Sequence, residues 1–89
     1  MKTKKITELL KALSHPTRLM IVEELLKKEK CVNDITDLLN VRQPNISQHL
    51  YILKANHIVD WKREGRMRCY HLENPELIKS LVDMLRKNK

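Results

Sequence analysis

The sequence predicts a small, mainly helical domain that carries a single β-hairpin. Apolar residues recur at helical spacing along most of the chain, and the 89 residues include only one Gly and three Pro. Apolar residues make up 42% and charged residues 33%, a balance typical of folded globular proteins rather than disordered ones. We expect residues 1–89 to form one domain, because no linker or internal repeat divides them.

Four helices are expected before the hairpin. The apolar residues three and four positions apart predict helices over residues 4–13, 16–28, 31–39 and 43–55. Ser14-His15-Pro16 separates the first two, since Pro suits the first turn of a helix. The second helix is apolar on more than one side, which predicts a central position.

A change of period marks the hairpin. The β-prone runs Ile58–Lys62 and Met67–Leu72 flank Arg63-Glu64-Gly65-Arg66, which contains the one Gly of the chain. Asn74-Pro75 then predicts the start of a last helix over residues 75–86, with Asn as the cap and Pro in the first turn.

The order of these elements is that of a winged helix-turn-helix. Two short helices, 31–39 and 43–55, are joined by three residues, and a hairpin with a basic tip follows them. In such a unit the second helix lies in the DNA major groove. The charge favours the same partner, because the net charge is +7 and residues 42–68 carry six basic groups against two acidic ones. We therefore expect double-stranded DNA as a partner.

Four segments resemble the ArsR/SmtB family of small winged-helix repressors: Leu10–Leu19, Cys31–Ile35, Gln43–Lys54 and Ile58–Tyr70. The resemblance covers about residues 6–86. It implies a homodimer that is joined through its first and last helices, binds an imperfect inverted repeat and is released by an effector. The apolar faces of those helices also exceed what so small a core can cover. The expected dimer interface contains Leu9, Leu10, Leu13, Leu77, Ile78, Leu81 and Leu85.

Candidate DNA contacts come from the second helix of the pair and from the hairpin. Gln and Asn side chains can pair with adenine, and Arg can reach phosphates or the minor groove. His49 could instead pack inside the protein, and each Arg could be a solvated surface charge. Arg18 could bind a phosphate or pair with Glu23 or Glu24. The candidates are Gln43, Pro44, Asn45, Ser47, Gln48, His49, Arg63, Arg66 and Arg68.

Two cysteines are the candidate effector site. The family's Cys-Val-Cys pattern here reads Cys31-Val32-Asn33, and the zinc pattern of the last helix is absent, because no His follows His71. Cys31 stands at the expected helix N-cap, a position that favours a thiolate. The resemblance implies that a short strand before the helix pair lies beside the hairpin strand of Cys69, which would make the sulfurs neighbours.

Three interpretations of this pair stay open. The favoured one is a sensor of a soft ion, with trivalent arsenic or antimony held by Cys31 and Cys69. The second is a redox or reactive-sulfur switch through a Cys31–Cys69 bridge. In the third, both cysteines are buried apolar residues and the repressor has no small effector. Zinc held by the two cysteines with His71 and Asp34 is a weaker hypothesis. No other cofactor is expected.

Other function classes find little support in the sequence. An enzyme is not expected, because the chain has no Gly-rich phosphate loop and no recognisable catalytic triad. A winged helix that contacts RNA or protein is disfavoured by the polar face of residues 43–55. The chain has no segment long and apolar enough for a membrane and no signal peptide, so we expect a cytoplasmic protein with reduced cysteines.

Overall fold

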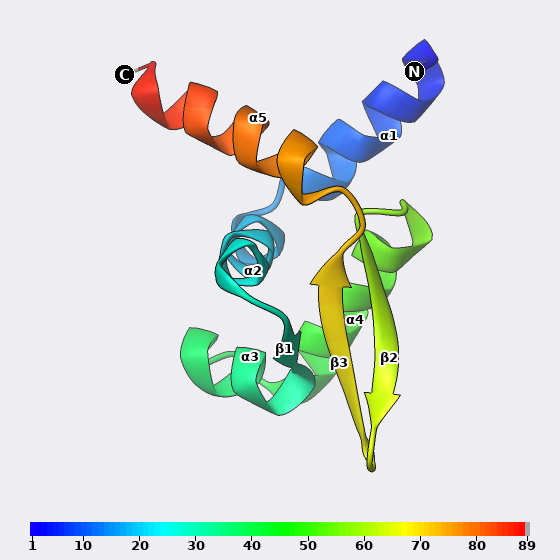
Figure 1. Ribbon diagram of the computed structural model, residues 1–89, viewed down its shortest axis with the longest axis vertical. Coiled ribbons are helices and arrows are strands. Elements are labelled where there is room, and N and C mark those ends of the chain that lie inside the picture. Colours follow the sequence, from blue (N-terminus) through cyan, green and yellow to red (C-terminus); the bar gives the residue numbers. More distant parts are fainter. Residues whose placement is uncertain (89) are drawn as a thin grey trace.

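The computed structural model describes residues 1–88, which form five helices and a small antiparallel sheet (Figure 1). The predicted helices and hairpin are confirmed, with ends that differ by one or two residues. The fold is the winged helix-turn-helix that the order of elements predicted. The elements are α1 (Thr3–Leu13), α2 (Pro16–Lys27), β1 (Lys30–Cys31), α3 (Val32–Leu39), α4 (Gln43–Ala55), β2 (Val59–Glu64), β3 (Met67–Leu72) and α5 (Pro75–Lys87).

Local signals in the sequence set the helix ends. His15 is the N-cap of α2: its ring Nδ1 accepts a hydrogen bond from the Thr17 backbone N–H at 3.1 Å. Asn74 caps α5 in the same way, with Oδ1 accepting from the Leu77 N–H at 3.2 Å. Helix α3 ends at Leu39, and the C-cap Asn40 has a φ of 53°, in the left-handed region that Asn tolerates.

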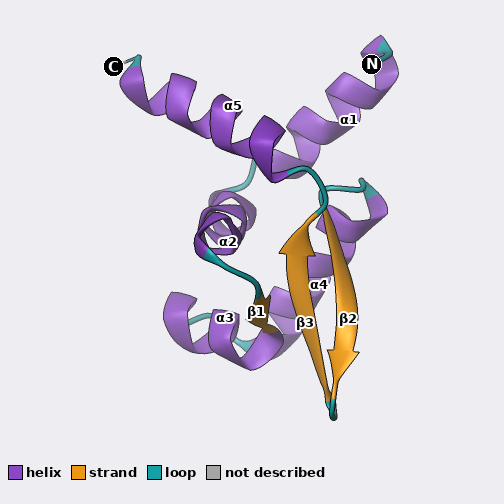
Figure 2. Cartoon of the chain, viewed as in Figure 1, coloured by secondary structure: helices purple, strands orange, loops and turns teal. Residues whose placement is uncertain are grey.

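The three strands form one sheet in the order β1-β3-β2, so β3 is central (Figure 2). All pairs are antiparallel, and Gly65 makes the hairpin turn with a φ of 63°. The register places Cys69 opposite Cys31 on one side and opposite Lys62 on the other. Since alternate residues of a strand share a face, Glu64 lies on the same face as Lys62 and Cys69.

Helix α2 is the centre of the core, as its apolar pattern predicted. Ile21 and Val22 are fully buried, and α4 and the hairpin pack on the same cluster. Ile46, Leu50 and Leu53 bury one face of α4, which leaves its opposite face in solvent. The core thus fixes which side of α4 is available to a partner.

Helices α1 and α5 spread apart at the end of the molecule opposite the hairpin tip (Figure 1). Among the predicted interface residues, Leu13 and Ile78 are buried inside the protomer, and Leu9 and Leu81 are partly buried against its core. These four residues therefore pack α1 and α5 against the core of the protomer. The apolar side chains that α1 and α5 expose are Ile6, Leu10, Leu77, Met84 and Leu85.

Candidate functional site

The solvent face of α4 is polar at its N-terminal end. Ile46 and Leu50 anchor the helix on the core, and the side chains between and before them point outward. The five candidates of the first two turns are all exposed, in agreement with the helical spacing: Gln43, Pro44, Asn45, Ser47 and Gln48.

An open hollow lies between this face of α4 and the hairpin, which we call the wing (Val59–Leu72). It is lined by Gln43 and Ser47 from α4 and by Arg66 and Arg68 from the wing, so the fold brings four predicted residues onto one surface. Arg63 is exposed near the tip of the wing, in the pair next to the last one before the turn. The hollow is also lined by residues that were not among the candidates: Tyr51, Lys54 and Trp61. Their signal was their place on the polar face of α4 and in the wing.

Arg68 of β3 is exposed, and its guanidinium stacks on the ring of Trp61 in β2. Its guanidinium carbon lies 4.3 Å from the centre of the Trp61 ring, within the range of a cation–π interaction. Arg63 and Arg68 face each other in the register of β2 and β3. The stacking of Arg68 on Trp61 orders one of the wing's positive charges beside the hollow.

His49 is half-buried, because its ring packs on the ring of His15 with centroids 4.5 Å apart. Arg18 lies on the same pair, with Nη1 3.4 Å from His49 Nδ1, and its Nε donates to the Ala12 carbonyl at 2.6 Å. Burial, and then the charges of His15 and Arg18, lower the pKa of His49 below its ordinary value. His49 thus joins α4 to the start of α2.

Of the two alternatives for Arg18, the ion pair with Glu23 or Glu24 is wrong. Glu23 accepts from Arg86 of α5, and Glu24 pairs with Lys27 and Lys30. Arg18 points to the other side of α2, toward α1 and α4, where it contacts the Ala12 carbonyl and the His49 ring.

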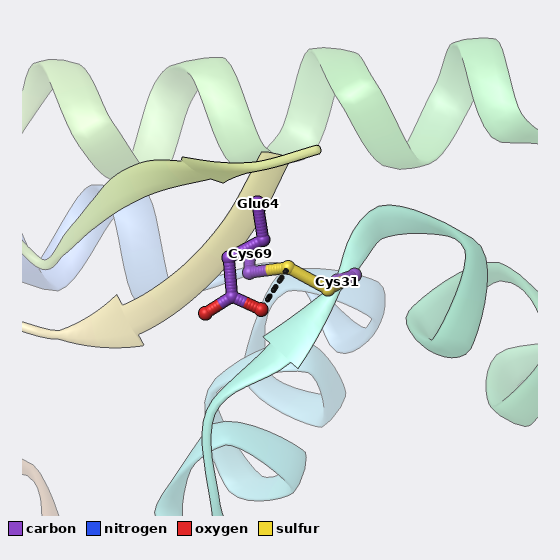
Figure 3. A group of neighbouring side chains, drawn as sticks. All are labelled: Cys31, Glu64 and Cys69. Carbon is purple, nitrogen blue, oxygen red and sulfur yellow. Dashed lines mark hydrogen bonds between the residues drawn. A yellow bond between two sulfur atoms is a disulfide. The ribbon is translucent and has the colours of Figure 1, made fainter. Parts of the chain in front are cut away.

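Cys31 and Cys69 are neighbours, as the resemblance implied, and a disulfide joins them (Figure 3). The expectation of two reduced thiols is therefore corrected, because the paired register of β1 and β3 brings the sulfurs into bonding contact. Cys69 is almost fully buried, with 1% of its surface exposed, whereas Cys31 is half-buried. The bond connects the start of α3 directly to the wing.

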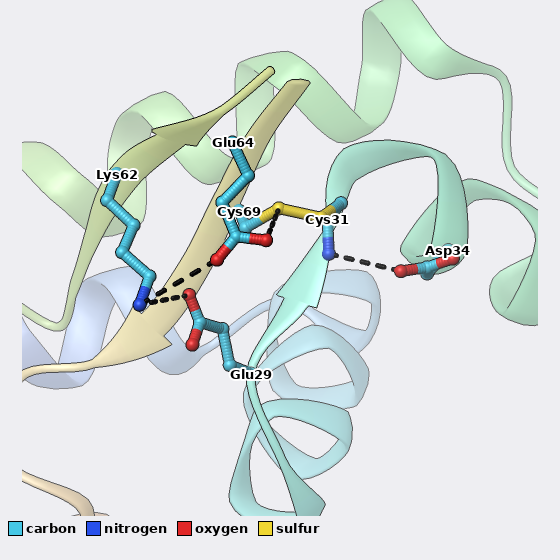
Figure 4. Close-up of a disulfide and its surroundings, with 6 residues drawn as sticks. All are labelled: Glu29, Cys31, Asp34, Lys62, Glu64 and Cys69. Atoms are coloured by element: carbon cyan, nitrogen blue, oxygen red, sulfur yellow. Dashed lines mark hydrogen bonds and ion pairs between the residues drawn. A yellow bond between two sulfur atoms is a disulfide. The ribbon is translucent and has the colours of Figure 1, made fainter. Parts of the chain in front are cut away.

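A carboxylate lies beside this disulfide. Glu64 Oε2 is 3.8 Å from Cys69 Sγ, and Lys62 Nζ lies 3.7 Å from the other oxygen of Glu64 (Figure 4). Lys62 also pairs with Glu29, at 3.5 Å. Cys31, Glu64 and Cys69 each offer a metal-ligating atom, and these atoms lie within 4.8 Å of one another.

The zinc ligands proposed from the sequence need correction. Among the described residues, neither Asp34 nor His71 belongs to this cluster. The Asp34 carboxylate instead accepts from the Cys31 backbone N–H at 3.3 Å, as the third residue of α3 in a capping box whose N-cap is Cys31. Glu64 was missed, although the hairpin register contains the signal: it stands two residues beyond Lys62, the partner of Cys69.

Comparisons with known proteins agree with this geometry. Residues 15–60 match the family described as "Bacterial regulatory protein, arsR family". The chain is also 43% identical over 76 residues to the HTH-type transcriptional repressor SmtB of Mycobacterium tuberculosis, a match that covers 85% of this chain. The chain belongs to the ArsR family. Its match spans only 56% of the length of that SmtB relative.

Two further proteins resemble this ArsR-family chain over nearly its whole length. The HTH-type transcriptional regulator MJ1325 of Methanocaldococcus jannaschii is 43% identical over 88 residues, covering 94% of this chain and 98% of that protein. The structure of HlyU from Vibrio cholerae N16961 matches with a TM-score of 0.85 and 29% identity, covering 98% of this chain and 96% of HlyU. In residues 1–88 of the ArsR-family chain, every helix is too short or too polar to cross a membrane.

Proposed function

We propose that this ArsR-family protein is a transcriptional repressor that binds double-stranded DNA as a homodimer. The observation that carries the proposal is the hollow between α4 and the wing, with Gln43 and Ser47 on one wall and Arg66 and Arg68 on the other. Amide and hydroxyl side chains can distinguish base edges in the major groove, and the wing's guanidinium groups can neutralise phosphates.

The second copy of the chain is proposed to cover α1 and α5. Leu10 and Leu85 are 49% and 65% exposed on these two helices, beside Ile6, Leu77 and Met84. An apolar face of this kind is stabilised when a partner removes it from water. Two copies would present two α4 helices, which is the arrangement that an inverted repeat requires.

Fluorescence anisotropy tests this function. The reduced protein is titrated onto a labelled duplex from upstream of its own coding sequence and onto a scrambled duplex of equal length. We expect tight, salt-sensitive binding to the first duplex and much weaker binding to the second. Equal affinity for both duplexes, or a preference for single strands, would contradict a sequence-selective repressor.

For the effector, the disulfide favours the redox hypothesis. A two-electron oxidant, hydrogen peroxide, would convert the thiols of Cys31 and Cys69 into the disulfide and itself into two waters, with both thiol protons ending in those waters. The bond would fix the wing relative to α3, so that the wing could no longer adjust to a DNA groove. We therefore propose that the reduced protein binds the operator and the oxidised protein leaves it.

The arsenite hypothesis needs the same two sulfurs as free thiolates. The chain contains only these two cysteines, so a third ligand would have to come from another group. Anisotropy of the protein–DNA complex with peroxide or with arsenite separates the two effectors. Release by peroxide that is absent in Cys31→Ser supports the redox switch. Release by arsenite alone would replace it with soft-ion sensing, and release by neither would leave a repressor without a small effector.

A further inference from the structure

The sulfur pair has a third chemical group beside it that the redox switch does not use. Glu64 stands on the face of the wing that carries Cys69 and Lys62. Cys31 lies beside Cys69 on the neighbouring strand β1. Glu64 is exposed, so its carboxylate meets the sulfurs from the solvent side. Figures 3 and 4 show its carboxylate turned toward the Cys31–Cys69 pair.

We propose that Cys31, Cys69 and Glu64 of the reduced protein bind a divalent, thiophilic cation of the zinc type. The proposal rests on the proposed thiol switch, because it requires the same two sulfurs to exist as thiolates. It assigns a ligand to the reduced state, whereas the redox hypothesis describes only the bond that forms on oxidation.

The distances suit such a cation. Zinc binds sulfur at about 2.3 Å and carboxylate oxygen at about 2.0–2.2 Å, so tetrahedral ligand atoms stand roughly 3.3–3.8 Å apart. Glu64 Oε2 and Cys69 Sγ are separated by 3.8 Å, and all three donor atoms lie within 4.8 Å of one another. Once the disulfide is reduced, the two sulfurs need only move apart to the same spacing.

The donor set discriminates between cations. Two thiolates favour zinc-like ions over magnesium or calcium, which prefer oxygen ligands. The third donor is a carboxylate rather than a third sulfur, and zinc accepts it readily. Because Glu64 is exposed, water has access to complete the coordination, and the cation has a path of entry.

Neighbouring charges hold the carboxylate in place. Lys62 Nζ lies 3.7 Å from Glu64 Oε1 and leaves Oε2 directed at the sulfur, while Glu29 holds Lys62 from the other side. Partners of this kind orient metal ligands and tune affinity. The backbone of Cys31 is fixed in turn by its hydrogen bond to Asp34.

Cation and disulfide exclude each other, which couples the site to oxidation. When hydrogen peroxide oxidises the pair, each thiolate gives up one electron and the sulfurs bond to each other. The peroxide takes the two electrons and two protons from solvent to become two waters, and the cation leaves with its charge unchanged. Oxidation should therefore release one cation for each disulfide formed.

Cadmium titration tests the site, because thiolate-to-cadmium charge transfer absorbs in the ultraviolet. The full chain is reduced, freed of metal and titrated without oxygen. We expect a charge-transfer band that saturates at one cadmium per chain, competition by zinc, and release of zinc to a coloured chelator when peroxide is added. Glu64→Gln should weaken cadmium binding by about 10–100-fold, with Glu73→Gln as a control of equal charge change outside the site.

Two results would overturn the inference: no charge-transfer band in the reduced wild type, or equal cadmium affinity in Glu64→Gln and wild type. Circular dichroism of each variant establishes that it is folded. DNA binding of reduced and oxidised protein in the presence of a chelator is measured separately. If DNA binding still responds to oxidation while cadmium does not bind, the cation site fails and the proposed switch stands.

Discussion

The ring of His15 lies against the ring of His49, 4.5 Å between centroids, so the residue that caps α2 touches α4, the helix with the polar, solvent-exposed face. His15 holds the cap through Nδ1, which accepts from the Thr17 N–H at 3.1 Å. Arg18 adds a positive charge on the same pair. Protonation of His49 would place a second positive charge beside Arg18 at the junction of α2 and α4.

We expect the protein to lose stability as the pH falls below about 6.5. Burial, and then His15 and Arg18, hold the pKa of His49 below the ordinary 6.5 of the unfolded chain. Below pH 6.5 the unfolded state binds the proton first, so the free energy of unfolding declines until the folded-state pKa is also passed. Urea unfolding between pH 5 and 8 measures this slope, which His49→Gln should reduce.

The control for this pH effect is His57→Asn. His57 is an exposed histidine with a φ of 59°, a conformation that Asn tolerates. This variant removes a histidine outside the His15–His49 pair, one that lies 3.9 Å from Glu73, so the part of the slope assigned to His49 should remain. A His49→Gln variant whose unfolding free energy follows pH as steeply as the wild type would contradict the assignment to His49.

Reduction should destabilise the oxidised protein by about 3–4 kcal/mol. The disulfide closes a loop between residues 38 positions apart, and this lowers the entropy of the unfolded chain. Denaturant unfolding with and without a reductant measures the difference. In Cys69→Val, which keeps an apolar side chain in the buried position, the reductant should change nothing. Equal stability of oxidised and reduced wild type would show that the bond adds no constraint.

Leu85→Glu should convert the proposed dimer into monomers at micromolar concentration. Leu85 is 65% exposed on α5, and a charge there would have to be desolvated in an interface. Sedimentation equilibrium measures the mass. Leu38→Glu is the matched control, because Leu38 is 57% exposed on α3, at the far end of the molecule from α1 and α5 (Figure 1). Loss of the dimer in both variants, or in neither, would place the interface elsewhere.

Arg66→Ala and Gln43→Ala should weaken DNA binding in different ways. The wing residue Arg66 is proposed to contact phosphate, so its loss should lower affinity on all duplexes and reduce the salt slope by about one for each contact removed. Gln43 is proposed to contact a base, so its loss should cost about 1–3 kcal/mol on the operator alone. Anisotropy at several salt concentrations on operator and scrambled duplexes distinguishes them. Identical effects of the two substitutions would refute this division of roles.

The Trp61–Arg68 contact gives an optical probe of the wing. Trp61 is the one tryptophan of the sequence and stacks with Arg68 at 4.3 Å. We expect its fluorescence to change when operator DNA binds, because Arg68 lines the same hollow. Arg68→Met, which keeps much of the side chain's bulk but not its charge, should remove the cation–π contact and alter the emission of the free protein. Emission unchanged by Arg68→Met would contradict the contact. Emission unchanged by operator DNA would contradict the proposed role of the wing in DNA binding.

The sequence determined the elements and their order, because these depend on local signals. Apolar spacing defined the helices, His15-Pro16 and Asn74-Pro75 marked helix starts, and Gly65 marked the turn of the hairpin. The same spacing placed the polar face of α4 correctly, since one buried stripe dictates the opposite exposed one.

The tertiary structure decided which distant side chains meet. Leu13 and Ile78 share the apolar pattern of Leu10 and Leu85, yet packing buries the first pair and exposes the second. Arg18 contacts the Ala12 carbonyl and His49 instead of a glutamate, because it lies on the side of α2 that faces α1 and α4. The hairpin register puts Glu64 on the face of Cys69, and the pairing of β1 with β3, which no local pattern encodes, adds Cys31.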